Sequence, residues 1–331
     1  MDFSTIIGID VSKLTLDIHV LPDRQVFKTE NDPPGIKRLL CWLENECQIN
    51  LSDSLFAFEY TGFYSYQLAV HLQDRGYSFV MLPGLELKRS FGISRGKSDR
   101  VDAEKIAEYT FLRRTKLSPM QLPESTILEM KRLLSLRVKL VRQRAGFKAT
   151  VREAKRALKR SEGLLYYRIQ EDMVNRLTLH ITQLEKQLAA LVENHPELKK
   201  QYDLIVSIRS VGPQTALTMI AVTHGFHKFP TWRKFACYSG TAPFPYESGT
   251  SIHGKTKISH LANKRIKSIL GNIAGCAIQH NSELRAYYQK RIKEGKNKMS
   301  TQNIIRNKLI ARIFAVVERG TPYVDMMKYA S

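Results

Sequence analysis

Hydrophobic and polar positions in the first part of the chain alternate with the period of β-strands. An apolar run from Ile6 reaches Asp10, a short turn follows, and residues 14–20 alternate apolar and polar side chains. This pattern predicts a β-hairpin. A third strand is predicted at 24–30, and short apolar strands are predicted at 55–59 and 77–82.

Helical segments stand between these strands. Residues 36–47, after the turn at 31–35, and residues 66–75 carry apolar side chains at helical spacing. With a further helix after the last strand, the order β-β-β-α-β-α-β-α predicts an α/β layer fold of the RNase H type.

The middle of the chain has a different pattern. Between residues 123 and 198 Gly and Pro are almost absent and Leu recurs at helical spacing. This predicts a hairpin of two long helices, at about 126–160 and 165–195, with the break at Ser161-Glu162-Gly163. Residues 131–160 carry twelve Lys or Arg and one acid, Glu153. Such a block is either a solvated helix face or a surface that contacts phosphates.

Short helical segments return after Tyr202. The segment Ile208–Ala216 looks like a helix-hairpin-helix turn, in which backbone N–H groups at a helix start would hold a phosphate. An ordinary turn between two helices is the alternative. The remaining segments are predicted as a polar, hydroxyl-rich loop at 243–258, a helix from 264, a basic loop at 295–300 and a last helix at 303–317.

The composition is that of a globular protein. The chain has 331 residues, 43% hydrophobic and 25% charged, and no run approaches the ~18 apolar residues of a membrane span. The segment Met1-Asp2-Phe3-Ser4 lacks a signal-peptide pattern, so a cytoplasmic protein is expected. The cysteines show no CxxC or zinc-ligand spacing, and buried free thiols are predicted at Cys41, Cys47, Cys237 and Cys276.

Positive charge is concentrated in the last two thirds of the chain. The net charge is +21, with −1 in residues 1–120 and +22 in residues 121–331. This asymmetry predicts a neutral unit joined to a unit that binds a polyanion, and nucleic acid is the expected partner. A membrane surface fits less well, because the basic part has no amphipathic helix anchored by Trp or Phe.

Four carboxylates of the neutral third could act together. Asp10 and Glu59 each end a strand, and in a sheet of the RNase H type these strands are neighbours, so the two side chains converge. Asp99 and Asp102, three residues apart on a predicted helix, share one face. Taken singly, Asp10 could be a turn residue, and the other two could be acids that favour a helix N-terminus.

Clustered carboxylates repel one another unless a cation neutralises them. Hard oxygen ligands suit Mg²⁺ or Mn²⁺ rather than zinc. A pair of such ions would also supply what phosphodiester cleavage needs, which is an activated nucleophile and a stabilised leaving oxygen.

Six segments, in one order over residues 5–320, carry a resemblance to a known family: Gly8–Lys13, Phe58–Gly62, Lys97–Ala103, Ile208–Ala216, Phe235–Pro243 and Tyr246–Gly249. With these motifs the chain resembles the DEDD-type transposases of bridge-RNA-guided insertion sequences, a family that includes Piv-type DNA invertases. The resemblance implies a RuvC-like RNase H-fold domain at 1–122, a basic coiled-coil linker at 123–200 and a mainly α-helical transposase domain at 201–331.

The resemblance also implies the roles of single residues. Asp10, Glu59, Asp99 and Asp102 would bind the metal and act in catalysis. Ser248 would be the nucleophile and would hold the cut strand as a phosphoserine, in a composite site with the acids of another subunit. The implied assembly is a dimer, or a tetramer when DNA ends are paired.

The implied partners are donor and target DNA duplexes and a structured non-coding guide RNA, in a bacterial or archaeal cell and at the nucleoid. No membrane partner is expected. The residues expected to contact nucleic acid lie in the basic helices, at the turn after 208 and near 255–267: Arg142, Arg144, Lys148, Arg152, Lys155, Arg156, Gly212, Lys255, Lys257, Lys264, Arg265 and Lys267.

From the residues alone the choice of serine stays open. Ser248 precedes Gly249, which allows close backbone approach, but Thr250 and Ser251 are hydroxyls of the same segment. A solvent-exposed Ser/Gly loop without chemistry is the further alternative. For the whole chain, the alternatives to a transposase are a DNA invertase of the same family, a resolvase-like metal nuclease without a covalent intermediate, and a basic nucleic-acid-binding protein without activity.

Overall fold

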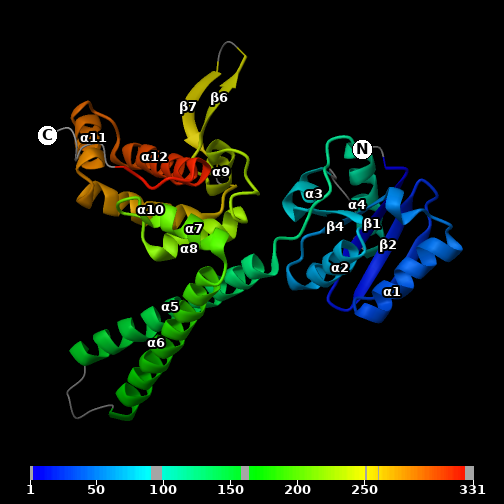
Figure 1. Cartoon of the computed structure of the whole chain (residues 1–331), viewed down its shortest axis with the longest axis horizontal. Coiled ribbons are helices and arrows are strands. Elements are labelled where there is room, and N and C mark those ends of the chain that lie inside the picture. The colour runs from blue at the N-terminus through cyan, green and yellow to red at the C-terminus, as the bar shows by residue number, and fades with distance from the viewer. Residues whose placement is uncertain (1–2, 91–98, 158–163, 250–251, 260, 325–331) are drawn as a thin grey trace. The chain divides into compact units, whose positions relative to one another are not determined.

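The chain folds as two units, which we call unit 1 (Met1–Leu122) and unit 2 (Pro123–Ser331). The computed structural model describes residues 3–90, 99–157, 164–249, 252–259 and 261–324. Unit 1 is mixed α/β and unit 2 is mainly helical (Figure 1). The charge divides at the same boundary, with −1 in residues 1–122 and +22 in residues 123–331.

Unit 1 is built on a five-stranded mixed sheet. Its strands are β1 (Thr5–Val11), β2 (Thr15–Leu21), β3 (Val26–Glu30), β4 (Ser54–Glu59) and β5 (Ser78–Leu82). Their order across the sheet is β3-β2-β1-β4-β5, with β1–β2 and β2–β3 antiparallel and β1–β4 and β4–β5 parallel. The five predicted strands are confirmed, and the arrangement is consistent with the predicted RuvC-like fold.

Helices cover both faces of this sheet. The helices α1 (Pro33–Cys41) and α2 (Phe63–Asp74) pack on the face that carries Ile7, Ile9 and Phe56. The helices α3 (Gly84–Ser90) and α4 (Asp99–Arg113) pack on the face of Ile6 and Ala57. The predicted helix at 36–47 is confirmed, although its last part, Trp42–Glu46, is a π-helix.

Unit 2 begins with a helical hairpin made of α5 (Ser125–Ala157) and α6 (Leu164–Glu193) (Figure 1). The predicted break at 161–163 lies outside the described residues. Only the first part of α5, at Ile127, Met130 and Leu134, is buried in the core of unit 2. Leu177 and Ile181 of α6 are buried outside that core, so apolar packing extends along the hairpin beside its polar contacts, and a coiled-coil geometry stays a prediction.

Six helices form the body of unit 2. They are α7 (Pro196–Val206), α8 (Pro213–Thr223), α9 (Trp232–Ser239), α10 (Lys264–His280), α11 (Ser282–Lys293) and α12 (Lys298–Arg319). The last helix begins five residues before the predicted start at 303. Its N-cap explains the difference, because the Asn297 side chain accepts hydrogen bonds from the N–H groups of Met299 and Ser300.

The prediction of a polar loop at 243–258 is wrong. This segment forms an antiparallel ribbon of β6 (Pro243–Ser248) and β7 (Ile252–Ile258). Its hydroxyls and prolines are typical of loops, but a two-stranded ribbon has only edge strands, where proline is tolerated. Tyr246 is paired with Gly254, and a Cβ at Gly254 would lie 2.8 Å from the Tyr246 ring, so the glycine makes room for the tyrosine.

The four cysteines are free, as predicted, but the prediction that they are buried is wrong. Cys41 and Cys237 are exposed, and the other two are partly exposed. For Cys41 the helical phase explains this, because the buried side of α1 carries Ile36, Leu39 and Leu40. In the described part of the chain, no helix combines the length and apolar character that crossing a membrane requires.

Candidate active site

Two of the four predicted acids lie at the same edge of the sheet in unit 1. In the parallel register of β1 and β4, Gly8 is paired with Ala57 and Ile9 with Phe58. The next position on each strand is Asp10 and Glu59. Since side chains alternate along a strand, both acids are on the face that α4 covers.

The helix α4 lies directly on β1. A Cβ at Gly8 would be 2.5 Å from the backbone nitrogen of Ala107 and 2.6 Å from the carbonyl oxygen of Ala103. Only glycine leaves room for this contact. The close approach brings the first turn of α4, which carries Asp99 and Asp102, to the strand that ends near Asp10.

The other predicted acids are near enough to Asp10 for their charges to act on it. Burial is the first cause that raises the pKa of Asp10, and the negative charges of Asp99, Asp102, Asp17 and Glu59 raise it further, to about 6. The segments that supply these side chains are far apart in the sequence. The structure therefore places these side chains within reach of the charge of Asp10, and their joint action at one site stays a prediction.

Asp17 is a fifth carboxylate of this group, and the sequence reasoning missed it. It is paired with Asp10 across β1 and β2, it is buried, and its Oδ2 lies 3.1 Å from the Nζ of Lys28. The sequence did contain a signal for this pairing, because the register of a short hairpin determines which residues lie opposite each other. We expect this acid to add to the repulsion at Asp10 rather than to act by itself.

Glu59 and Asp102 each have a defined neighbour. A Cβ at Gly84, the first residue of α3, would lie 1.9 Å from Oε1 of Glu59, so the carboxylate rests against the glycine backbone. The Oδ1 of Asp102 lies 3.5 Å from the Nζ of Lys105, one turn further along α4. A substitution at Gly84 would therefore displace Glu59 directly.

The donor set suits a hard divalent cation. The atoms concerned are carboxylate oxygens, and burial followed by the nearby negative charges raises the pKa of Asp10. In the described part of the chain, no three His, Cys, Asp or Glu side chains are gathered closely enough to hold a metal ion. Asp10, Glu59, Asp99 and Asp102 are the residues that could hold one after a further closing of their side chains.

The predicted nucleophile lies in unit 2. Ser248 is the last residue of β6, paired with Ile252, and Gly249 after it has φ +57°. The competing hydroxyls of Thr250 and Ser251 lie outside the described residues. A cavity of about 750 Å³ stands at the same ribbon, and its lining combines aromatic and basic side chains with small ones: Cys237, Phe244, Pro245, Tyr246, Gly254, Lys257, Ile258, Ser259 and Leu261.

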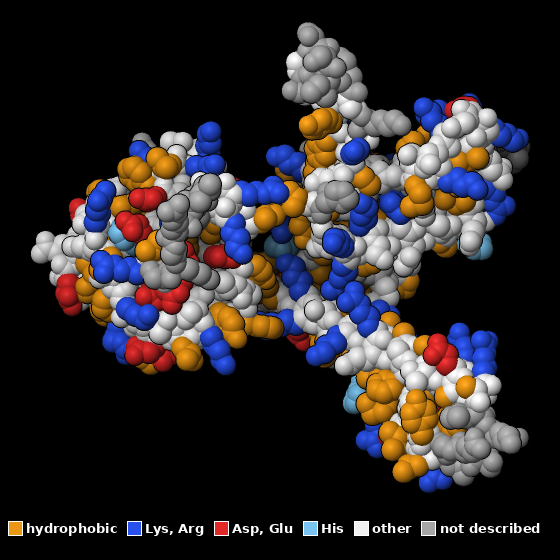
Figure 2. Space-filling view, turned by 180° about the vertical axis from the view of Figure 1, so that it is seen from behind, with side chains coloured by type: hydrophobic (Ala, Val, Ile, Leu, Met, Phe, Trp, Pro, Cys, Tyr) orange, Lys and Arg blue, Asp and Glu red, His pale blue; other side chains and the backbone are white. Residues whose placement is uncertain are grey.

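The predicted basic contacts on α5 are accessible. Of these, Arg144 is partly buried and the others are exposed: Arg142, Lys148, Arg152, Lys155 and Arg156. On the face shown in Figure 2, Lys and Arg side chains are spread over unit 2, whereas Asp and Glu gather on unit 1. This distribution fits a polyanion-binding unit 2 and a neutral unit 1.

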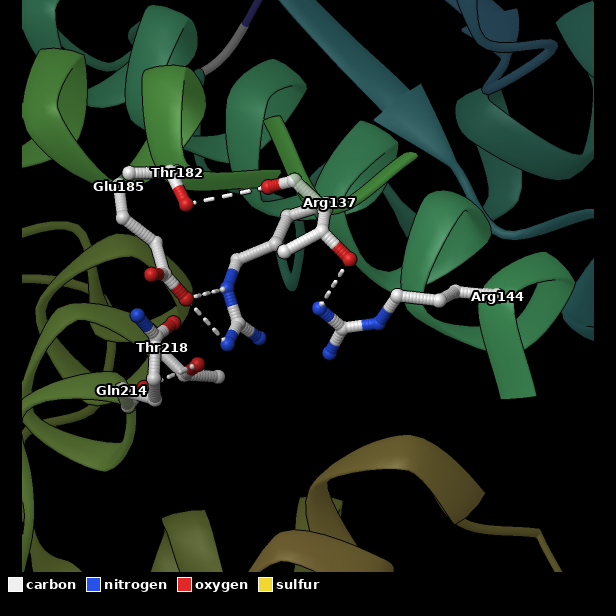
Figure 3. A network of polar contacts seen from close by, with 7 residues as sticks. Arg137, Arg144, Thr182, Glu185, Gln214 and Thr218 are labelled. Carbon is white, nitrogen blue, oxygen red and sulfur yellow. Dashed lines mark hydrogen bonds and ion pairs between the residues drawn. The ribbon is translucent and has the colours of Figure 1, made fainter. Parts of the chain in front are cut away.

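Some of these basic side chains also tie α5 to α6. Arg137 donates two hydrogen bonds to Oε1 of Glu185, at 2.8 and 2.6 Å, and Arg144 donates one to Thr178 at 3.3 Å (Figure 3). Lys155 pairs with Glu171 at 2.5 Å. Arg144 and Lys155 therefore hold the hairpin together in the free protein.

Predicted contacts from distant segments also meet. Arg265, near the start of α10, donates a hydrogen bond to the carbonyl oxygen of Leu134 on α5. Burial lowers the pKa of Arg265, and the positive charges of Arg142 and Arg137 lower it further. The other predicted positions are the N-cap of α8 at Gly212, the strand β7 for Lys255 and Lys257, and the first turn of α10 for Lys264 and Lys267.

Comparison with known proteins identifies a family of transposases. A DEDD transposase model of the IS110 group, described as a transposase, matches residues 7–159, and a model described as the transposase IS116/IS110/IS902 family matches residues 202–289. Together the two matches include the segments of Asp10, Glu59, Asp99 and Asp102 and the segment of Ser248.

Relatives of similar length are also found. A pilin gene-inverting protein of Moraxella lacunata is 27% identical over 327 residues, 96% of this chain and 97% of that protein. The pilin gene-inverting protein of Moraxella bovis gives the same figures, 27% identity with 96% and 97% covered. The insertion element IS110 uncharacterized 43.6 kDa protein of Streptomyces coelicolor is 32% identical over 146 residues, 44% of this chain and 34% of that protein.

Proposed function

The chain belongs to the IS110 family of transposases, and on this basis we propose that it cuts and rejoins the DNA of an insertion sequence. One observation carries the proposal. Asp10 and Glu59 lie at one edge of the unit 1 sheet, on the face that α4 covers, and burial together with the charges of Asp99, Asp102, Asp17 and Glu59 raises the pKa of Asp10. A repulsive cluster of this kind costs stability, and such clusters occur at sites that act on charged substrates.

The four acids would bind Mg²⁺ or Mn²⁺. A divalent cation bound there supplies positive charge for the attacking and the leaving oxygen of a phosphodiester. The residues themselves provide the ionised oxygens, and α4 holds Asp99 and Asp102 in place through its contact at Gly8. Lys105, near Asp102, would lose its ion pair when the cation binds.

Ser248 would be the nucleophile in unit 2. In the proposed step, a bond forms between the serine oxygen and phosphorus, and the bond from phosphorus to one DNA oxygen breaks. The hydroxyl proton ends on that leaving oxygen, and the strand stays on the protein as a phosphoserine. Attack by another strand end would reverse the step and rejoin DNA without loss of phosphodiester energy. We propose that the acids of one subunit act with Ser248 of another.

The partners would be donor and target DNA duplexes and a structured non-coding guide RNA. The charge of +22 on residues 123–331 supports a polyanion partner of unit 2. Base pairing with a guide RNA would supply the choice of target, because a basic surface contacts phosphates without reading bases.

DNA inversion is the second candidate function. It is favoured by the two pilin gene-inverting proteins, which match 96% of this chain. Inversion and transposition would use the same acids and the same serine, so they differ in the products. An inverted segment between two sites would indicate an invertase, and an element joined to new flanks would indicate a transposase.

Adduct trapping tests the proposed chemistry. The protein is mixed with the element's DNA ends, its flanking non-coding RNA and Mg²⁺, then quenched in denaturant, and the mass of the protein band is read. We expect a covalent protein–DNA adduct that Ser248→Ala abolishes, because the attacking oxygen is gone. Asp102→Asn should abolish it too, since the cation would lose a ligand.

Ser251→Ala is the matched control, because it removes a hydroxyl three residues away and should leave the adduct intact. Cleavage without any adduct would instead identify a metal nuclease. Binding without cleavage in the presence of the element's own RNA and DNA would identify a nucleic-acid-binding protein that has no activity.

A further inference from the structure

Three basic side chains of unit 2, one from α5 and two from the loop after α8, lie near one another. Lys131 extends from α5, His224 is the C-cap of α8, and Lys228 follows four residues later. The Nζ of Lys131 lies 2.5 Å from Nε2 of His224. We call these three residues the lysine–histidine cluster. None of them was among the nucleic-acid contacts expected from the sequence.

The loop that carries His224 and Lys228 has a fixed conformation. His224 and Phe226 both have φ in the left-handed region, at 53° and 69°. The Phe226 N–H donates to the Thr223 hydroxyl at 3.0 Å, and the Lys228 N–H donates to the Thr223 carbonyl at 2.9 Å. Two non-glycine residues in this region are costly, and such conformations persist where the surrounding structure holds them in place.

Aromatic rings form one wall of the cluster. The Nζ of Lys228 lies 5.5 Å from the ring centroid of Phe229 and 5.3 Å from that of Tyr238. Tyr238 is fixed in turn, because its hydroxyl accepts a hydrogen bond from Nδ2 of Asn263 at 3.0 Å. The Lys228 residue is exposed as a whole, although burial of its ammonium group lowers its pKa.

The two ammonium groups have no carboxylate partner in the described part of the chain. Among the residues that the structure describes, no ion pair joins a carboxylate to Lys131 or Lys228. Burial, and then the charge of Lys228, lower the pKa of Lys131 to about 8, and burial lowers the pKa of Lys228. Burial and both lysines lower the pKa of His224 to about 3. The imidazole is therefore neutral at pH 7 and accepts a hydrogen bond from Lys131.

We propose that Lys131 and Lys228 together bind one backbone phosphate of the nucleic acid held by unit 2. His224 orients the Lys131 ammonium group, and the Tyr238 ring supports that of Lys228. An ammonium group is a compact point charge that binds phosphate, and two of them can contact one phosphate from different sides. Lys131 also begins the basic stretch of α5. This inference rests on the nucleic-acid binding in the proposed function and names one contact of it.

The test is binding of the full-length protein to a fluorescent DNA duplex of unrelated sequence, measured by anisotropy at several salt concentrations. The variant is Lys131→Gln with Lys228→Gln. Its affinity at low salt should fall about tenfold or more, as for a charge-assisted contact. The slope of log affinity against log salt should decrease by about 1, because one phosphate contact is lost.

Lys37→Gln is the control for the loss of one charge, as in Lys228→Gln alone, since Lys37 is an exposed lysine on α1 of the neutral unit. It should leave both affinity and slope at the wild-type values. Lys228→Gln alone, at an exposed position, should also weaken binding. This single variant replaces the double variant in the test if circular dichroism shows that the double variant does not fold.

Wild-type affinity and slope in folded variants would overturn the inference, while the proposed function would stand. Weaker binding to polyglutamate with unchanged binding to the duplex would also overturn it, in favour of an acidic protein partner. A wild-type protein that does not bind nucleic acid at all would count against the proposed function itself.

Discussion

At the scale of single residues, Asp10 sets the electrostatic state of the acidic site. Its pKa is raised from 3.8 to about 6 in the folded protein. Between these values the folded chain binds more protons than the unfolded chain, so the contribution of Asp10 to stability falls as pH rises from about 4 to 6. Above that range the ionised side chain continues to destabilise unit 1 unless a cation binds.

Asp10→Asn should therefore stabilise the metal-free protein at pH 7.5. We expect the midpoint of thermal unfolding of unit 1 to rise by about 2 °C or more, and to match the wild type near pH 3.5, where the aspartate is protonated. Added Mg²⁺ should raise the wild-type midpoint and leave that of Asp10→Asn unchanged. Asp23→Asn, at an exposed position of the same unit, is the control. A lower midpoint for Asp10→Asn at pH 7.5 would contradict this account.

The sequence predicted residues whose placement depends on local rules. Asp10 and Glu59 follow from strand ends, and Asp99 and Asp102 from helix spacing. It did not predict the meeting of Lys131 with His224, because these residues are 93 positions apart and no local pattern relates α5 to the end of α8. Contacts of that kind depend on how helices pack.

At the scale of elements, two glycines, which have no functional side chain, determine the positions of the acids. Gly8 allows the backbone of α4 to contact β1, and Gly84 allows the carboxylate of Glu59 to rest on α3. The two differ in what a methyl group would meet. At Gly8 it would meet backbone atoms of a helix, and at Gly84 it would meet the end of a flexible side chain.

Gly8→Ala should therefore lower the free energy of unfolding by about 1–3 kcal/mol, the usual cost of overpacking, and should also reduce DNA joining. Gly84→Ala should reduce DNA joining with little loss of stability, because the Glu59 side chain can move aside. Thermal unfolding and product yield separate the two effects. Gly146→Ala on α5 is the control, since nothing lies within 4 Å of its added methyl group. Equal loss of stability for both variants would contradict the distinction.

Most elements were predictable because their periodicity is local. The strands of unit 1 and the two long helices follow from alternation and from Leu spacing. The β6–β7 ribbon was not predicted, because Pro243, Pro245 and Gly249 are typical of loops and nothing in the sequence states that Tyr246 pairs with Gly254. In an isolated ribbon the pairing itself, rather than an apolar face, defines the strands.

At the scale of the whole molecule, the charge is divided between the two units. Unit 1 is close to neutral, and unit 2 carries the excess of +22. Nucleic acid would therefore be held by one unit and be acted on by acids of the other. Each chain offers one set of these acids and one Ser248, whereas exchange between two duplexes needs several strand cuts.

We expect the complex that recombines DNA to contain two or four copies of the chain. Light scattering coupled to size exclusion, on protein mixed with the element's DNA ends, RNA and Mg²⁺, measures its mass. A duplex of unrelated sequence is the control and should not give the paired-end complex. Recombination by a complex with a single copy would rule out a composite site.

The contact at Gly8 has a consequence for comparing related genes. Copies of an insertion sequence accumulate substitutions. Whether a copy is functional is usually decided from whether its acids are intact. Consider a copy that keeps all four carboxylates and Ser248 but has another residue in place of Gly8. Its α4 could no longer contact β1 closely, and Asp99 and Asp102 would be displaced as a result. Gly8 and Gly84 should therefore be compared together with the acids when functional copies are distinguished from inactive ones.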